Sequence, residues 1–328
     1  MPIIVLTTAA GAPGASTTAL GLTLSWPGPA LLVEADPAGT SLVPGWFRGA
    51  IDPTERNIVN LALVEHVEDM TEAIFDQVIS IGAVEEEHER LALLGLVDPV
   101  QAPALEEKHW WEPIGAALQS LSAAGYAVII DAGRLTQGSY PLPLLGIADQ
   151  VLVVCRAELS AVLRSYPMAV QLKASLTNTG NADTLGVVAI GNGGHRYYPA
   201  AVVAKQLGGG FGFALPDDPL AAAALSDGLA LPPRLSARVR ARFTRESRDD
   251  EPQLAGASAA GDGPDEEGDA DAGSDESDRA QAAASTEQPP TRIVVPARLM
   301  RAYRAVARDS AHRAEQRLNR LLTERART

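Results

Sequence analysis

A glycine-rich segment near the start of the chain holds the residues best suited to binding a phosphate. Residues 10–17 read AGAPGAST and lie between a short apolar run and a stretch that suits a helix. A loop in this position wraps backbone N–H groups around phosphate oxygens at the N-terminus of a helix. Gly11 and Gly14 allow the tight path of the chain, and the Ser16 hydroxyl would face a Mg²⁺ ion. The segment therefore predicts a phosphate-binding turn.

The loop lacks the cation that such loops place before the serine. A lysine normally stands there and neutralises the β- and γ-phosphates, but this chain has Ala15. Losing it should cost several kcal/mol, because each charge-assisted hydrogen bond contributes about 1.5–3 kcal/mol. Pro13 also removes one N–H from the loop. Two interpretations stay open: an empty or weakly occupied turn, and a site that binds ATP without efficient turnover.

The rest of the first 243 residues reads as alternating strands and helices. Short, nearly continuous apolar runs are typical of strands buried on both faces of a parallel sheet, and they occur at residues 3–7, 30–34, 127–131, 151–155 and 185–190. Segments with helical spacing lie between them, at residues 16–24, 111–124 and 157–174. Between residues 51 and 108 the best candidates are a helix over 71–80 and a strand over 91–96. This alternation predicts an α/β fold with a doubly wound, mostly parallel sheet, whose ligands bind at the carboxyl ends of the strands.

Two segments of opposite charge follow. Residues 245–291 hold 14 acidic residues against 3 arginines and almost no large apolar side chain, so we predict a disordered acidic linker over 244–291. Residues 292–328 hold 10 arginines against 3 acidic residues. They predict a basic amphipathic helix, whose apolar stripe consists of Leu299, Tyr303, Val306, Ser310, Ala314, Leu318 and Leu321. The predicted domains are therefore 1–243, 244–291 and 292–328.

Several classes of protein are disfavoured by composition. The single cysteine, Cys155, rules out a disulfide within the chain and is typical of a reducing compartment. No apolar stretch approaches the ~20 residues needed to cross a bilayer, and the N-terminus lacks a basic signal-peptide region. We therefore expect a cytoplasmic protein that can be peripheral at a membrane or the nucleoid. The scattered histidines and the lack of a G-x-S-x-G elbow give no support to zinc or hydrolase chemistry.

The first strand and loop resemble the deviant Walker A loop of the bacterial ParA and MinD proteins, written KGGxGK[ST]T. The segment keeps both outer glycines and the pair Ser16 and Thr17, but it has Ala10 and Ala15 where the family has lysines. Further similar elements follow in the family's order, namely LLVEADPAGTSL, GYAVIIDAG, ADQVLVVCRAELSAV, LGVVAIGN and ALPDDPLAAAALSDGLAL. The resemblance therefore implies the P-loop NTPase fold, with Gly11, Gly14, Ala15, Ser16 and Thr17 along the phosphates.

The resemblance also implies roles for residues beyond the loop. Asp36 would orient the attacking water and the metal shell, which makes it the catalytic residue if the protein is active. Asp131 would hold the water shell of Mg²⁺ together with Ser16, and Asn192 would contact the base. Glu34 stands where the family has a further aspartate.

The missing lysines set this chain apart from the family. In ParA and MinD proteins the signature lysine reaches the nucleotide of the partner subunit, a contact that Ala10 cannot make. Arg48 and Arg134 are the nearby cations that would have to substitute. The resemblance thus implies ATP and Mg²⁺ as ligands, while the lost charge argues against tight binding and efficient hydrolysis.

Three functions are compatible with these features. The first is a ParA/MinD-like pseudo-ATPase that positions or scaffolds other components, in chromosome partitioning, septum placement, or secretion or pilus localisation. The TadZ/CpaE group of pilus localisers is similar in including atypical Walker A loops. The second is an active ATPase that dimerises on ATP, and the third is a nucleic-acid-binding module that uses the arginine-rich helix.

The last helix has four alternative roles in these functions. It could dock on its own domain, pair with a second copy or a partner protein, lie on an anionic membrane surface, or bind DNA. We favour a homodimer or a protein partner, because Ser310 and Ala314 make the apolar stripe thin for membrane insertion.

Overall fold

The computed structural model describes residues 1–9, 14–63, 70–82, 88–105, 108–135, 142–191, 195–228 and 297–325. These residues belong to one compact unit, in which the last helix is joined to the N-terminal part of the chain. The predicted acidic linker at 244–291 lies outside the described residues.

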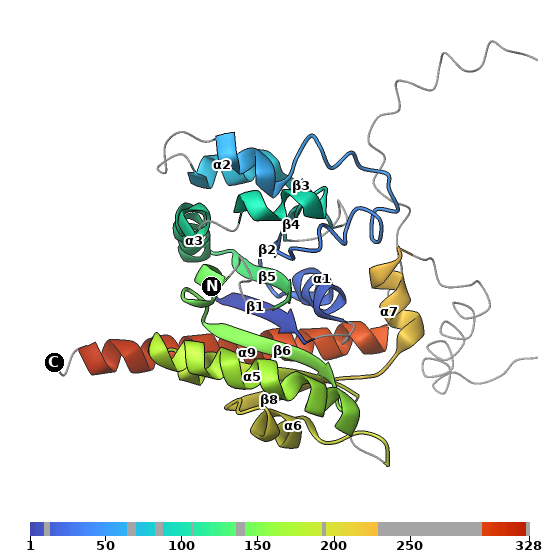
Figure 1. Cartoon of the computed structure of the whole chain (residues 1–328), viewed down its shortest axis with the longest axis vertical. Helices are drawn as coiled ribbons and strands as arrows, with labels where there is room; N and C mark the ends of the chain where they lie inside the picture. The colour runs from blue at the N-terminus through green and yellow to red at the C-terminus, as the bar shows by residue number, and fades with distance from the viewer. Residues whose placement is uncertain are drawn as a thin grey trace, which may run out of the picture. The chain divides into compact units, whose positions relative to one another are not determined.

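Eight strands of the described chain form a single sheet in the order β3-β4-β2-β5-β1-β6-β7-β8 (Figure 1). Neighbouring strands pair in parallel, except that β3 runs antiparallel to β4 at one edge. The strands are β1 (Ile3–Thr8), β2 (Ala30–Glu34), β3 (Val78–Ser80), β4 (Arg90–Leu93), β5 (Ala127–Arg134), β6 (Gln150–Arg156), β7 (Leu185–Ile190) and β8 (Phe211–Leu215). The predicted doubly wound, mostly parallel α/β fold is confirmed.

Helices cover both faces of this sheet. One face carries α2 (Met70–Gln77), α3 (Lys108–Ala123), α4 (Leu142–Leu145), α5 (Leu159–Asn178) and α6 (Ala200–Gln206). The other carries α1 (Ala15–Ser25), α7 (Pro219–Ser226) and α9 (Ala297–Arg325). Short 3₁₀ turns span Ile58–Leu63, Pro99–Leu105 and Ala182–Thr184. Successive side chains of a strand point to opposite faces, so β1 sends Ile3 and Val5 into one apolar cluster and Ile4 and Leu6 into the other.

Two predicted boundaries in the middle of the chain are wrong. The helix expected over 71–80 ends at Gln77, and Val78–Ser80 forms β3 instead. The strand expected over 91–96 is β4, which ends at Leu93. Strand β3 exists because it pairs with β4, and such pairing between strands can override a local helical pattern. Strand β8 was not predicted, because glycines at 208–210 and 212 make its surroundings look like a turn.

Helix α9, red in Figure 1, packs along its first half on the face of the sheet that carries α1. Tyr303 is 3% exposed, and a Cβ added to Gly21 of α1 would lie 2.4 Å from its ring. Along the predicted stripe, Leu299, Tyr303, Val306 and Ser310 are buried, Ala314 is half-buried, and Leu318 and Leu321 are exposed. Of the four roles considered for this helix, docking on its own domain is the one that the structure shows for the first half.

None of the described helices is both long enough and apolar enough to span a membrane.

Candidate functional site

The predicted site residues come from three neighbouring strands that end at one edge of the sheet. Strand β5 lies between β1 and β2. The turn into α1 follows β1, Asp36 follows β2, and Asp131 lies in β5 directly opposite Glu34. Ligands of open α/β sheets bind at the carboxyl ends of the strands, and the structure brings these residues together at that end.

Gly14 shapes the start of α1. Its φ of 118° and ψ of 0° suit a residue without a side chain. A Cβ built on Gly14 would also lie 2.8 Å from Ile190 Cδ1 of β7. The carbonyl of Gly14 accepts the hydrogen bond of the Thr18 N–H at 2.8 Å. Both the backbone conformation and the approach of β7 therefore require glycine at the entrance to the helix.

Ser16 and Asp131 are in direct contact. The Ser16 hydroxyl donates a hydrogen bond to the Asp131 carboxylate, and the Gly133 N–H donates a second one to Oδ1 at 3.0 Å. The Thr7 hydroxyl donates to the Gly133 carbonyl at 3.0 Å, so β1 holds the end of β5 in place. This contact joins the loop serine to the aspartate for which the sequence predicts a role at a metal ion.

Burial controls the protonation of Asp131, which is 2% exposed. Its pKa is raised to about 7, chiefly because burial disfavours the charged carboxylate. The hydrogen bonds from Ser16 and Gly133 lower this pKa, while the charges of Asp36 and Glu34 raise it. Near neutral pH the carboxyl group is therefore about half protonated, and a bound cation would compete with this proton.

Asp36 lies against the turn at the end of β5. Gly133 has a φ of 55°, and a Cβ added there would be 2.0 Å from the Asp36 carboxyl carbon. The Ala38 N–H donates to Asp36 Oδ1 at 2.8 Å. Burial raises the pKa of Asp36, and the hydrogen bond from Ala38 and the charge of Arg134 act in the opposite direction. Asp36 and Asp131 thus form one electrostatically coupled acidic cluster.

The Glu34 carboxylate is hydrogen-bonded to the segment after β2 and to the end of β4. Its carboxylate accepts hydrogen bonds from the Ser41 N–H at 2.7 Å, the Ser41 hydroxyl at 2.9 Å, the Leu42 N–H at 3.0 Å and the Gly95 N–H at 3.2 Å. The Thr40 hydroxyl donates to it as well. Glu34 is 2% exposed, so these donors satisfy a buried charge. The residue that stands for the family's aspartate therefore ties the segment after β2 to the end of β4.

Ala15, which the sequence predicts to replace the lysine of a phosphate loop, has a buried side chain. The side chain is 4% exposed and belongs to the apolar cluster that includes Ile4 and Leu20. Of the two arginines considered as substitutes, Arg134 lies close enough to Asp36 to lower its pKa. Arg48 instead packs near the turn after α7, where its Cγ would lie 2.9 Å from a Cβ added to Gly228. Arg134 is thus the candidate cation that the structure brings to the acidic cluster.

A cavity of about 210 Å³ lies beside the start of α1, at the carboxyl ends of β6, β7 and β8. Its walls include Thr17 of α1, Ile190 of β7 and the first residues of α7. Leu299 and Tyr303 of α9 form a further wall, and the Tyr303 hydroxyl donates to the Thr17 carbonyl at 3.4 Å. Pockets for small molecules usually measure about 300–1,000 Å³. The volume of this cavity is below that range.

An ion pair that was not predicted lines the same cavity. Arg156 at the end of β6 bonds to both carboxylate oxygens of Asp217 at 3.1 Å. The hydrogen bond from the Tyr197 hydroxyl and the charge of Arg156 lower the pKa of Asp217. The sequence offers one signal for this pair: Arg156 ends the apolar run of β6, and Asp217 lies two residues after the last residue of β8.

Two predicted site residues, Gly11 and Asn192, lie outside the described residues, so their roles stay predictions; Ala10, which replaces the family's signature lysine, lies outside them as well. Ile190, two residues before Asn192, lines the cavity. Tyr303, by contrast, was predicted only as part of an apolar stripe, and nothing in the sequence indicated that it would meet Thr17.

The oxygen atoms of the acidic cluster suit a Mg²⁺ ion, which prefers carboxylate, hydroxyl and phosphate oxygens. Among the described residues, however, no group of three or more His, Cys, Asp or Glu is arranged to hold a metal ion. A Mg²⁺ ion beside Ser16 and Asp131 would therefore need phosphate or water oxygens to complete its shell. Such a shared shell is the usual way in which proteins bind Mg²⁺.

Comparison with solved structures shows the fold to which this arrangement belongs. A Cyanothece McdA variant solved in complex with ATP matches with a TM-score of 0.50 and 22% identity, over 78% of this chain and 99% of that one. MinD from Pyrococcus horikoshii, complexed with Mg-ADP, matches at 0.47 and 17%, over 69% and 86%. The MinC:MinD complex of Aquifex aeolicus matches at 0.42 and 13%, over 79% and 100%. No protein-family model and no curated protein matches the sequence. The chain has a ParA/MinD-type fold.

Proposed function

We propose that this chain is a ParA/MinD-like positioning or scaffold protein whose nucleotide site is degenerate. It would act in partitioning, septum placement, or secretion or pilus localisation, and it would bind Mg²⁺ and ATP weakly and hydrolyse ATP slowly or not at all. The fold and the cluster of Ser16, Asp36 and Asp131 support a site derived from a nucleotide switch.

The observation that carries the proposal is the contrast between this cluster and Ala15. The oxygen groups suited to a metal ion stand together at the end of the sheet, while the lysine position holds a buried methyl group. A triphosphate would then be held by backbone dipoles, the metal ion and at most Arg134. These interactions suit weak occupancy, because the charge-assisted bonds of a loop lysine are absent.

Binding of a fluorescent ATP analogue with Mg²⁺, combined with an assay of phosphate release, tests the proposal. We expect wild-type binding to be weak and phosphate release to be close to background. The variant Ala15→Lys should bind the analogue about tenfold to a hundredfold more tightly, since one charge-assisted hydrogen bond contributes about 1.5–3 kcal/mol. Ala116→Lys is the matched control, because it adds the same charge on the exposed face of α3.

Two results would contradict this view. Rapid, Mg²⁺-dependent phosphate release by the wild-type protein, abolished by Asp36→Asn, would identify a working ATPase. If Ala15→Lys and Ala116→Lys had the same affinity as the wild type, the loop would not have the geometry of a phosphate loop. Circular dichroism of each variant separates a change in binding from a loss of folded protein.

A further inference from the structure

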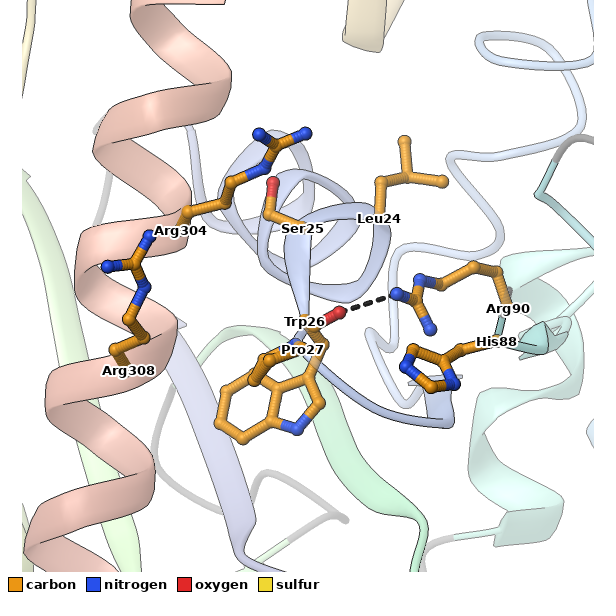
Figure 2. A pocket seen from close by; sticks show the side chains of 8 residues that line it. All are labelled: Leu24, Ser25, Trp26, Pro27, His88, Arg90, Arg304 and Arg308. Atoms are coloured by element: carbon orange, nitrogen blue, oxygen red, sulfur yellow. Dashed lines mark hydrogen bonds between the residues drawn. The ribbon is translucent and has the colours of Figure 1, made fainter. Parts of the chain in front are cut away.

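A second pocket, of about 360 Å³, lies at the other end of α1. It is formed by the last turn of α1, the residues that lead into β2, the start of β4 and one face of α9. Figure 2 shows Arg304 and Arg308 on one side, His88 and Arg90 on the other, and Trp26 between them. Since α1 has 11 residues, this pocket is about 16 Å from the phosphate loop along the helix axis.

The charged groups that line this pocket are basic. Among the described residues, no aspartate or glutamate contributes to its walls. Arg304 and Arg308 are exposed and form no ion pair or hydrogen bond with the described part of the chain. They stand one turn apart on α9, with Cβ atoms about 5–6 Å from each other, so both guanidinium groups can reach one ligand.

Other arginines of α9 are engaged by the protein itself. Arg317 bonds to Asn181 at 2.7 Å and lies 3.5 Å from Asp183. Arg313 stacks on the Phe211 ring, 4.3 Å from its centroid. The two pocket arginines therefore differ from these neighbours in having donors that are available to a ligand.

Arg90 lies on the far wall of the pocket and is held in place by backbone carbonyls. It is 7% exposed, and its guanidinium group donates to the carbonyls of Trp26, Gly28 and Glu89. The side chain of Glu89 is turned to the Tyr126 hydroxyl. These hydrogen bonds hold the guanidinium group of Arg90 at the wall of the pocket.

We propose that this pocket binds a small phosphorylated anion, either a free phosphate compound or the headgroup of a phospholipid. Guanidinium groups pair with phosphate oxygens through two parallel hydrogen bonds, and Arg304 and Arg308 offer two such forks one turn apart on α9. The volume is in the range of small-molecule pockets. A bound phosphate would also relieve the repulsion between two like charges one turn apart on the helix.

Calorimetric titration of the full chain with pyrophosphate, in EDTA to suppress metal-dependent binding at the phosphate loop, tests the free-ligand form. Pyrophosphate should bind saturably and raise the melting temperature of the wild type. The double variant R304Q/R308Q should bind it about tenfold more weakly or worse, because it loses the charge-assisted bonds of both side chains. The control R301Q/R320Q removes the same two charges at exposed positions outside the pocket and should bind within about twofold of the wild type.

Flotation with phosphatidylcholine vesicles that contain phosphatidic acid tests the headgroup form. Binding to these vesicles that R304Q/R308Q loses and R301Q/R320Q keeps supports a lipid headgroup as the source of the phosphate. Vesicles that fail to bind while pyrophosphate binds support a free phosphate compound. Both results support this pocket as the site that binds the phosphate group.

Other results would overturn the proposal. The first is that neither pyrophosphate nor the vesicles bind saturably, and the second is that both double variants lose the same amount of affinity. The third is that Ser16→Ala loses pyrophosphate binding while R304Q/R308Q keeps it, which would place the bound ion at the phosphate loop. If the two arginines only stabilise the C-terminal end of α1, R304Q/R308Q should lower the melting temperature, and pyrophosphate should leave the melting temperature of the wild type unchanged. The proposed function does not depend on any of these outcomes, because its tests use Mg²⁺, ATP and Ala15.

Discussion

Replacing Asp131 by asparagine removes the charge that the fold buries at the end of β5. The pKa of Asp131 is about 7 in the folded protein, against an ordinary value of 3.8. The folded state therefore holds this proton more tightly than the unfolded state does. As the pH rises from 3.8 to about 7, the unfolded chain loses this proton first, so the contribution of Asp131 to wild-type stability falls over this window and levels off above it.

The size of the effect follows from the two pKa values. Each pH unit between them changes the free energy of unfolding by about 1.4 kcal/mol, so a difference of about 3 units corresponds to about 4 kcal/mol. Asparagine keeps the shape of the side chain and an oxygen that can accept from Ser16 and Gly133, but it does not ionise. The stability of Asp131→Asn relative to the wild type should therefore rise by about 4 kcal/mol between pH 4 and pH 8.

Urea unfolding of both proteins at a series of pH values measures this difference. The control is Asp76→Asn, which removes a carboxylate from the exposed side of α2 and should show a small difference with little dependence on pH. If the difference between Asp131→Asn and the wild type were constant from pH 4 to pH 8, Asp131 would have an ordinary pKa. The reasoning from burial would then be refuted.

Two further substitutions test how the neighbouring elements are held. Gly21→Ala should lower the free energy of unfolding by about 1–3 kcal/mol, because its Cβ would meet the Tyr303 ring; Gly115→Ala in α3, whose Cβ finds ordinary contact distances, should be neutral or stabilising, and equal effects in urea unfolding would contradict the packing of α9 on α1. Glu34→Ala should destabilise by about 3 kcal/mol or more, since it leaves several buried donors without an acceptor, and an unchanged unfolding midpoint would show that water replaces the carboxylate.

The elements that could be predicted from the sequence are those whose pattern is complete within one segment. Strand β6 contains the continuous apolar run of residues 151–155, which is buried on both faces of the sheet, and such a run indicates a strand without knowledge of its neighbours. Strand β3 has only three residues and depends on its pairing with β4. Strand β8 is surrounded by glycines that weaken the local signal. Neither β3 nor β8 can be predicted from its own segment without knowing the strands beside it.

The contacts of the candidate site also differ in whether the sequence could predict them. The proximity of Ser16 and Asp131 could be predicted, because the order of the elements places both at the carboxyl ends of adjacent strands. The network around Glu34 could not, since one of its donors, Gly95, is 61 residues away in the sequence. Arg156 and Asp217 are also 61 residues apart, and they meet only because β6, β7 and β8 pair in parallel in the sheet.

Helix α9 contributes residues to the cavity at the start of α1 and to the pocket at its other end, although α9 is a separate segment in the sequence. Tyr303 packs over Gly21, donates to the Thr17 carbonyl and forms a wall of the cavity beside the start of α1. The next residue, Arg304, lines the pocket at the opposite end of α1. The 210 Å³ cavity is smaller than most small-molecule pockets, and α9 contributes Leu299 and Tyr303 to its wall. The same stretch of α9 therefore contributes side chains to both pockets.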